Sequence, residues 1–177
     1  DTVSNMWAES QESNKGFLKS LLIERPEVFL LNGGGNDLLQ ARKGPDGKMI
    51  GNLFFHLKDF QAGMGAKQLL KPSIEGEYDA VIGHLRNIVS KALAFAWVKK
   101  VVIHGYDYSF PDDDIWLGKP MAMRGIKGAV LQRSVVIELI DRLHNRLLAL
   151  AQSFGAPGRV IYVDVRGTVT AKSEWYD

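Results

Sequence analysis

The sequence lacks several features that would each define a class of protein. It contains no cysteine, which excludes disulfide bonds, thiolate catalysis and cysteine-ligated zinc sites. Its most apolar runs, such as "ALAFAWV" at 92–98, are far too short to span a bilayer. The 22 basic and 20 acidic residues are spread along the chain and leave a net charge of only +2. Because no basic stripe points to a nucleic acid or an anionic membrane, we expect neither as a partner.

The chain does contain enough apolar residues for one core. Of its 177 residues, 46% are hydrophobic and 24% are charged, which is typical of one soluble globular domain. We therefore expect a single domain over 1–177. The sequence indicates neither the compartment nor the oligomeric state.

Helical patterns and short apolar runs alternate along the chain. Apolar residues recur at helical spacing in three segments, and each segment is followed by an apolar run that ends in turn residues. The expected helices cover 14–24, 78–96 and 131–147, and the expected strands cover 27–33, 101–105 and 159–165. Short, almost fully apolar strands between amphipathic helices indicate parallel strands buried on both faces. We therefore expect an α/β fold with at least three parallel strands.

One long segment, 38–77, does not fit this alternation. It contains Gly44-Pro45-Asp46-Gly47 and a cluster of large apolar residues between Leu53 and Phe60. We interpret it as an excursion that packs over the sheet edge. The cluster either belongs to the core or binds an acyl chain.

The three expected strands end in polar and glycine-rich stretches. These are "NGGGND" at 32–37, "HGYDY" at 104–108 and "DVRG" at 164–167. In open parallel sheets, ligands bind beyond the carboxyl ends of the strands. We therefore expect the functional site at this edge of the sheet.

The triple glycine has two interpretations. Glycine lets a substrate approach the backbone and also accepts a positive φ. Asn36 beside it offers an amide donor to a developing oxyanion, which is worth about 3 to 4 kcal/mol in the transition state. Alternatively, the stretch is a tight turn in which Asn36 or Asp37 caps a following helix.

The stretch "GGND" after an apolar strand, together with "SEWYD" at 173–177, resembles the SGNH (GDSL-type) family of serine esterases. The resemblance implies a flavodoxin-like three-layer α/β/α sandwich with a parallel sheet. It implies that Asn36 donates to the oxyanion hole and that Asp177 orients the catalytic histidine. The expected substrate-binding residues are Gly34, Gly35, His104, Tyr106, Asp107 and Tyr108. For Tyr106, Asp107 and Tyr108, as for Trp116, the alternative is that they pack the loop.

The chain departs from the family pattern in two blocks. None of its ten serines follows Gly-Asp, and the histidine expected three positions after Asp177 lies beyond the last residue. The resemblance therefore covers a partial SGNH-type domain that is incomplete at both ends. It implies hydrolysis of carboxylic esters through a serine acyl-enzyme, with a small-molecule ester or acylated sugar as substrate and with no metal or cofactor.

The remaining histidines and the acidic run at 112–114 have structural interpretations. We interpret His56 as a packing residue and His84 and His144 as surface or helix-packing residues. We interpret Asp112-Asp113-Asp114 as a solvated turn or helix start rather than a metal site. The alternatives to ester hydrolysis are a carbohydrate O-deacetylase or acyltransferase on the same fold, and a non-catalytic module that binds anions through the strand-end glycines.

Overall fold

The computed structural model describes residues 3–8, 12–112, 114–155, 158–171 and 173. Asp177, the expected acid of the triad, lies outside the described residues. The helices are α1 (Val3–Trp7), α2 (Glu12–Lys19), the π-helical turn η1 (Ser20–Glu24), α3 (Gly35–Leu39), α4 (Leu53–His56), α5 (Ala66–Leu69), α6 (Ile74–Leu93), α7 (Gly118–Met123) and α8 (Ala129–Gln152). The strands are β1 (Val28–Asn32), β2 (Ala41–Lys43), β3 (Met49–Gly51), β4 (Lys100–His104) and β5 (Val160–Val163).

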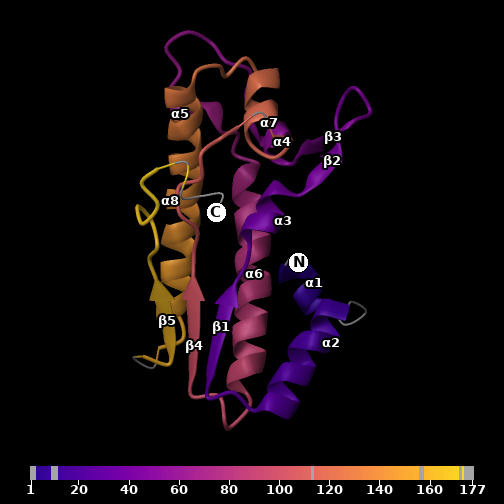
Figure 1. Cartoon of the computed structure of the whole chain (residues 1–177), viewed down its shortest axis with the longest axis vertical. Coiled ribbons are helices and arrows are strands. Elements are labelled where there is room, and N and C mark those ends of the chain that lie inside the picture. Colours follow the sequence, from indigo (N-terminus) through magenta and orange to yellow (C-terminus); the bar gives the residue numbers. More distant parts are fainter. Residues whose placement is uncertain (1–2, 9–11, 113, 156–157, 172, 174–177) are drawn as a thin grey trace.

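The central sheet has three parallel strands in the order β1-β4-β5. Leu30 pairs with Val102, which in turn pairs with Ile161. Helices α6 and α8 are the two crossover connections, and a separate antiparallel hairpin joins β2 to β3. The predicted mixed α/β fold with three parallel strands is confirmed (Figure 1).

The two long helices form because each has a continuous apolar stripe. In α6 this stripe is completely buried, and it includes Tyr78, Leu85 and Ile88. Two glutamates occupy the first turn of α6 and Lys91 occupies its last, which suits the helix dipole. The stripe of α8, from Val135 to Leu147, is likewise buried.

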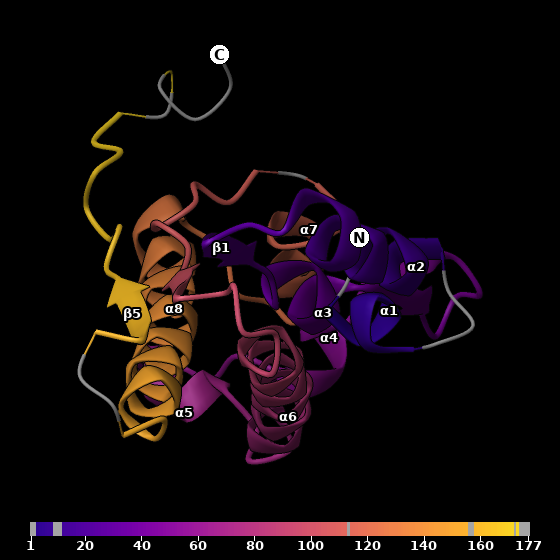
Figure 2. The same cartoon turned by 90° about the horizontal axis from the view of Figure 1, so that it is seen from below.

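Among the described residues, helices cover one face of the sheet and leave the other open. Both α6 and α8 lie on the same side of the strands (Figures 1 and 2). This follows because β4 and β5 are added in one direction, and right-handed crossovers then place every helix on one face. On the open face, Leu30 is 71% exposed and Val163 is 40% exposed. The described strands are thus not buried on both faces as expected, and the third layer of the sandwich stays a prediction.

The excursion at 38–77 lies beyond the carboxyl ends of the strands rather than over the sheet edge. Its hairpin and its short helices α4 and α5 gather there with α7 (Figure 1). Leu53, Phe54 and Leu57 are buried in it. The excursion therefore builds the region in which a site is expected.

Among the described helices, none combines the length and the apolar character needed to cross a membrane.

Candidate functional site

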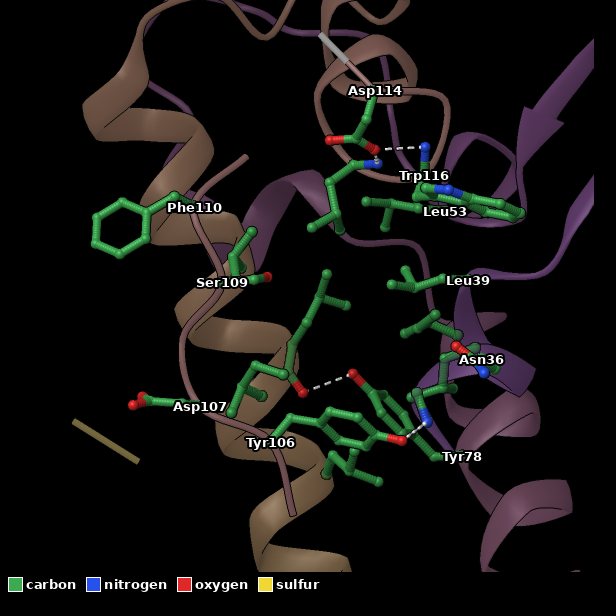
Figure 3. A pocket seen from close by; sticks show the side chains of 18 residues that line it. Asn36, Leu39, Leu53, Tyr78, Tyr106, Asp107, Ser109, Phe110, Asp114 and Trp116 are labelled. Carbon is green, nitrogen blue, oxygen red and sulfur yellow. Dashed lines mark hydrogen bonds between the residues drawn. The ribbon is translucent and has the colours of Figure 1, made fainter. Parts of the chain in front are cut away.

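A mostly apolar pocket of about 350 Å³ lies beyond the carboxyl ends of β1 and β4. Helix α3, the first turns of α6, the middle of α8 and the loop after β4 contribute its walls (Figure 3). The apolar lining residues include Leu38, Leu39, Leu53, Ile74, Val136, Leu139, Ile140 and Leu143. The polar ones are Asn36, Tyr78, Tyr106, Asp107, Ser109 and Asp114. An apolar cavity with a few polar groups is the usual form of a small-molecule site.

The glycines after β1 serve the packing of the chain itself. Gly34 has a φ of +103°, and a Cβ there would lie 2.7 Å from Cγ1 of Val81. A Cβ on Gly35 would lie 2.7 Å from Cζ of Tyr106. The side chains of Val81 and Tyr106 therefore occupy the space beside Gly34 and Gly35, and the expectation that a substrate approaches the backbone there is wrong. The expected positive φ is confirmed at Gly34.

Asn36 lies in the first turn of α3 and lines the pocket. It is exposed, and Figure 3 shows it at the edge of the pocket, across from Ser109 and Phe110. The N-cap of α3 is Gly34, so the expectation that Asn36 or Asp37 caps this helix is wrong. Asp37 instead accepts a 3.0 Å hydrogen bond from the backbone N–H of Ser4 in α1.

Two tyrosines form the floor of the pocket. The hydroxyl of Tyr106 accepts a 3.1 Å hydrogen bond from the N–H of Gly35, and the hydroxyl of Tyr78 donates at 2.9 Å to the carbonyl of Leu139 (Figure 3). Burial raises the pKa of Tyr106; the Gly35 hydrogen bond opposes this, and nearby Asp37 adds to it. Burial also raises the pKa of Tyr78. Both phenols are therefore neutral near pH 7, and the Tyr106 hydroxyl keeps a proton that it can donate.

Asp107 faces away from the cavity, although its residue contributes to the wall (Figure 3). Its carboxylate accepts hydrogen bonds from the N–H groups of Tyr108 at 2.6 Å, Gly167 at 2.6 Å and Val169 at 2.5 Å, and from the Thr168 hydroxyl at 3.0 Å. Burial alone would raise the pKa of Asp107, but these hydrogen bonds outweigh it and lower the pKa. The carboxylate thus anchors the segment after β5, so the geometry gives it a structural role.

The remaining predicted substrate residues lie outside the pocket lining. The Tyr108 hydroxyl donates at 2.8 Å to Asp141 on α8, and His104 donates from Nδ1 at 3.0 Å to the carbonyl of Gly105. Of the six predicted substrate-binding residues, the pocket brings together Gly35, Tyr106 and Asp107, and not Gly34, His104 or Tyr108.

A polar network on the far side of this wall was not anticipated from the sequence. Arg166 contacts Asp164, Asp141 and Nε2 of His144, and Nδ1 of His144 lies 3.0 Å from the Tyr162 hydroxyl. The hydrogen bond from Arg166 lowers the pKa of Asp164 to about 2. The sequence signal for this network was "DVRG" itself, with its acid and base two positions apart.

The acidic stretch before α7 forms a turn. Asp114 accepts hydrogen bonds from the N–H groups of Trp116 at 2.6 Å and Leu117 at 2.8 Å, and Asp113 lies outside the described residues. In the described part of the chain, no group of three or more His, Asp or Glu side chains is arranged to hold a metal ion.

No family model, curated protein or solved structure matched the chain. The SGNH resemblance therefore stays a prediction.

Proposed function

We propose that the chain is part of an SGNH-type ester hydrolase in which the pocket binds the acyl group and the Asn36 amide donates to the oxyanion. The observation that carries this proposal is the position of Asn36 at the edge of an apolar pocket beyond the end of β1. This is the edge of a parallel sheet at which ligands generally bind.

The character of the pocket supports a short or medium acyl group. Its volume of about 350 Å³ lies at the low end of the range for small-molecule sites, and its lining is mainly leucine, isoleucine and valine. Such a lining stabilises an alkyl chain by removing it from water. The neutral Tyr106 and the Ser109 hydroxyl supply polar groups for the ester.

The proposed reaction is two-step acyl transfer. A serine hydroxyl attacks the ester carbonyl while a histidine takes its proton and passes it to the leaving alcohol; water then releases the acyl group. The resemblance assigns this serine and histidine to blocks that the sequence does not contain. The contribution of this chain is therefore binding, oxyanion stabilisation by Asn36, and orientation of the histidine by Asp177.

The anion-binding alternative has less support. The N–H of Gly35 is already donated to Tyr106, and Gly34 packs on Val81. An O-deacetylase or acyltransferase would use the same residues and the same acyl pocket.

The role of Asn36 can be tested in a chain extended by the Gly-Asp-Ser strand and the terminal histidine block of an SGNH esterase. We expect Asn36→Ala to lower kcat for p-nitrophenyl acetate by about 10² to 10³, with KM little changed, because the amide acts mainly in the transition state. Asn32→Ala is the matched control, since Asn32 is an exposed asparagine at the end of β1 outside the pocket lining. Hydrolysis that is indifferent to Asn36→Ala would contradict the assigned role.

A further inference from the structure

A serine, a histidine and a glutamate meet at the start of α6, outside the lining of the apolar pocket. Nδ1 of His56 lies 2.9 Å from Oγ of Ser73, and Nε2 lies 3.3 Å from Oε1 of Glu77. His56 is only 6% exposed, whereas Ser73 is exposed. We call Ser73, His56 and Glu77 the His56 cluster.

The backbone around the His56 cluster holds the ring in place. The carbonyl of His56 accepts a 2.8 Å hydrogen bond from the N–H of Lys71, and Leu57 forms a β-bridge with Leu70. The ammonium group of Lys71 donates at 3.0 Å to the carbonyl of Phe55. These bonds join the end of α4 to the residues just before α6, so the ring is fixed against the first turn of that helix.

The same turn aligns the other two side chains. Ser73 and Glu77 are four residues apart, a spacing that places two side chains on one face of a helix. Ser73 is the N-cap of α6, yet its hydroxyl makes no capping hydrogen bond. Serine at an N-cap usually bonds the helix backbone. Here the hydroxyl lies against the imidazole instead.

The charges around His56 favour one tautomer. The negative charge of Glu77 lies 3.3 Å from Nε2, so it favours the proton on that nitrogen and leaves Nδ1 to accept from the Ser73 hydroxyl. Arg42 contacts the same Glu77 oxygen at 3.3 Å and helps to hold it. The ring is reversed relative to the usual triad, in which Nε2 faces the serine.

His56 is in the right protonation state to act as a base. Burial lowers its pKa below the ordinary value of 6.5, and Arg42 and Lys71 add to this effect. Glu77 acts in the opposite direction but does not reverse the shift. The imidazole is therefore neutral at pH 7.

We propose that the His56 cluster is an acyl-transfer site in which Ser73 is the nucleophile, His56 the general base and Glu77 the group that orients it. The substrates are small activated carboxylic esters that can reach an exposed hydroxyl. This activity is independent of the pocket and of Asn36, and it needs no residue outside the chain.

Each step of the reaction uses groups already present, together with water. Nδ1 of His56 takes the Ser73 proton while Oγ forms a bond to the carbonyl carbon, and the bond to the leaving alcohol then breaks as His56 returns the proton to that alcohol. Water attacks the acyl-serine in the same way, releasing the acid and restoring the serine. The N-terminus of α6, a helix of 20 residues, favours the negative charge that develops near Ser73.

The test is labelling of the intact chain with a fluorophosphonate, followed by mass spectrometry to locate the adduct. We expect the adduct on Ser73, and we expect Ser73→Ala to abolish it. His56→Gln should slow labelling by about 100-fold or more and Glu77→Gln by about 10-fold, in line with the usual size of general-base effects. Ser90→Ala is the matched control, because Ser90 is an exposed serine on the same helix, and it should leave the rate unchanged.

The pH profile provides a readout that a merely structural role would not move. Because the base must be neutral, labelling should rise with pH and reach half of its plateau below pH 6.5, the ordinary pKa of histidine. Thermal unfolding of each variant shows whether it is folded. If His56→Gln fails to fold, Glu77→Gln and the pH profile of the unaltered chain still decide. Labelling of Ser73 at the rate of Ser90, or a rate that rises only above pH 8, would overturn the proposal.

Discussion

The first turns of α6 present two different sets of side chains on two faces of one helix. Ile74 and Tyr78 face the apolar pocket, whereas Ser73 and Glu77 face His56. The pocket offers volume and the Asn36 amide, but none of its lining residues is a histidine. The His56 cluster offers a base and a hydroxyl at an exposed position. In this chain, therefore, the proposed acyl-binding groups and the proposed proton-transfer groups lie on different faces of the start of α6.

This separation has a kinetic consequence. Binding energy from remote parts of a substrate raises kcat only when it is used at the reacting atoms. Because the pocket does not contain the His56 cluster, ester hydrolysis at Ser73 should not improve when the acyl chain is lengthened. A pocket that worked with a nucleophile near Asn36 would show the opposite trend.

The largest expected effect concerns the wall of the pocket. Asp107→Asn should lower the free energy of unfolding by about 3 kcal/mol at pH 7, because a buried carboxylate that accepts several N–H bonds is replaced by a neutral amide. Urea unfolding measures this loss. Asp59→Asn is the control, since the Asp59 side chain is 79% exposed.

The loss of stability caused by Asp107→Asn should depend on pH. The pKa of folded Asp107 lies below the ordinary 3.8, so its contribution is complete above about pH 4. It is lost as the pH falls through the ordinary value towards the lower folded one. The difference between Asp107→Asn and the unaltered chain should therefore shrink below pH 4. A difference that stays constant down to pH 2 would mean that the charge of Asp107 is not what matters.

The next effect concerns the pocket floor. Gly35→Ala should destabilise the chain by about 1 to 3 kcal/mol, because the new methyl group would overlap the Tyr106 ring. Gly76→Ala, in the first turn of α6 with open space around its Cβ, should instead stabilise the helix by about 0.5 to 1 kcal/mol. Thermal unfolding compares the two. If the loss at Gly35 persists in a Tyr106→Leu background, contact with the ring is not its cause.

The sequence predicted the regular part of the molecule and missed the long-range polar contacts. The helical stripes and apolar runs located α6, β4, α8 and β5, because periodicity follows directly from local geometry. The interpretation of the glycines failed because the occupant of their space, Tyr106, lies about 70 residues further along the chain. No local pattern encodes such a contact.

The pairing of His56 with Ser73 is a second long-range contact that no local sequence pattern predicts. The expectation that His56 lies in a packed environment is confirmed, because it is buried. Its partner Ser73 lies 17 residues away, beyond a turn and the short helix α5, so the pairing depends on the β-bridge between Leu57 and Leu70. Only the four-residue spacing of Ser73 and Glu77 is a local sequence pattern. By itself it does not indicate a site, because the histidine comes from another segment of the chain.

The smallest expected effect is the one that separates the two regions most directly. Val136 is 2% exposed and lines the pocket from α8, so Val136→Phe should fill part of the cavity. We expect the affinity for octanoate to fall about tenfold, which corresponds to a loss of about 1.4 kcal/mol of binding free energy. Octanoate binding is measured through the fluorescence of the pocket residue Trp116. Val130→Phe is the control, because Val130 is 84% exposed at the start of the same helix.

Fluorophosphonate labelling of Ser73 in the same samples gives the second measurement. If octanoate affinity and Ser73 labelling fall together in Val136→Phe while the fold is intact, the two regions act as one site and the separation on α6 is wrong.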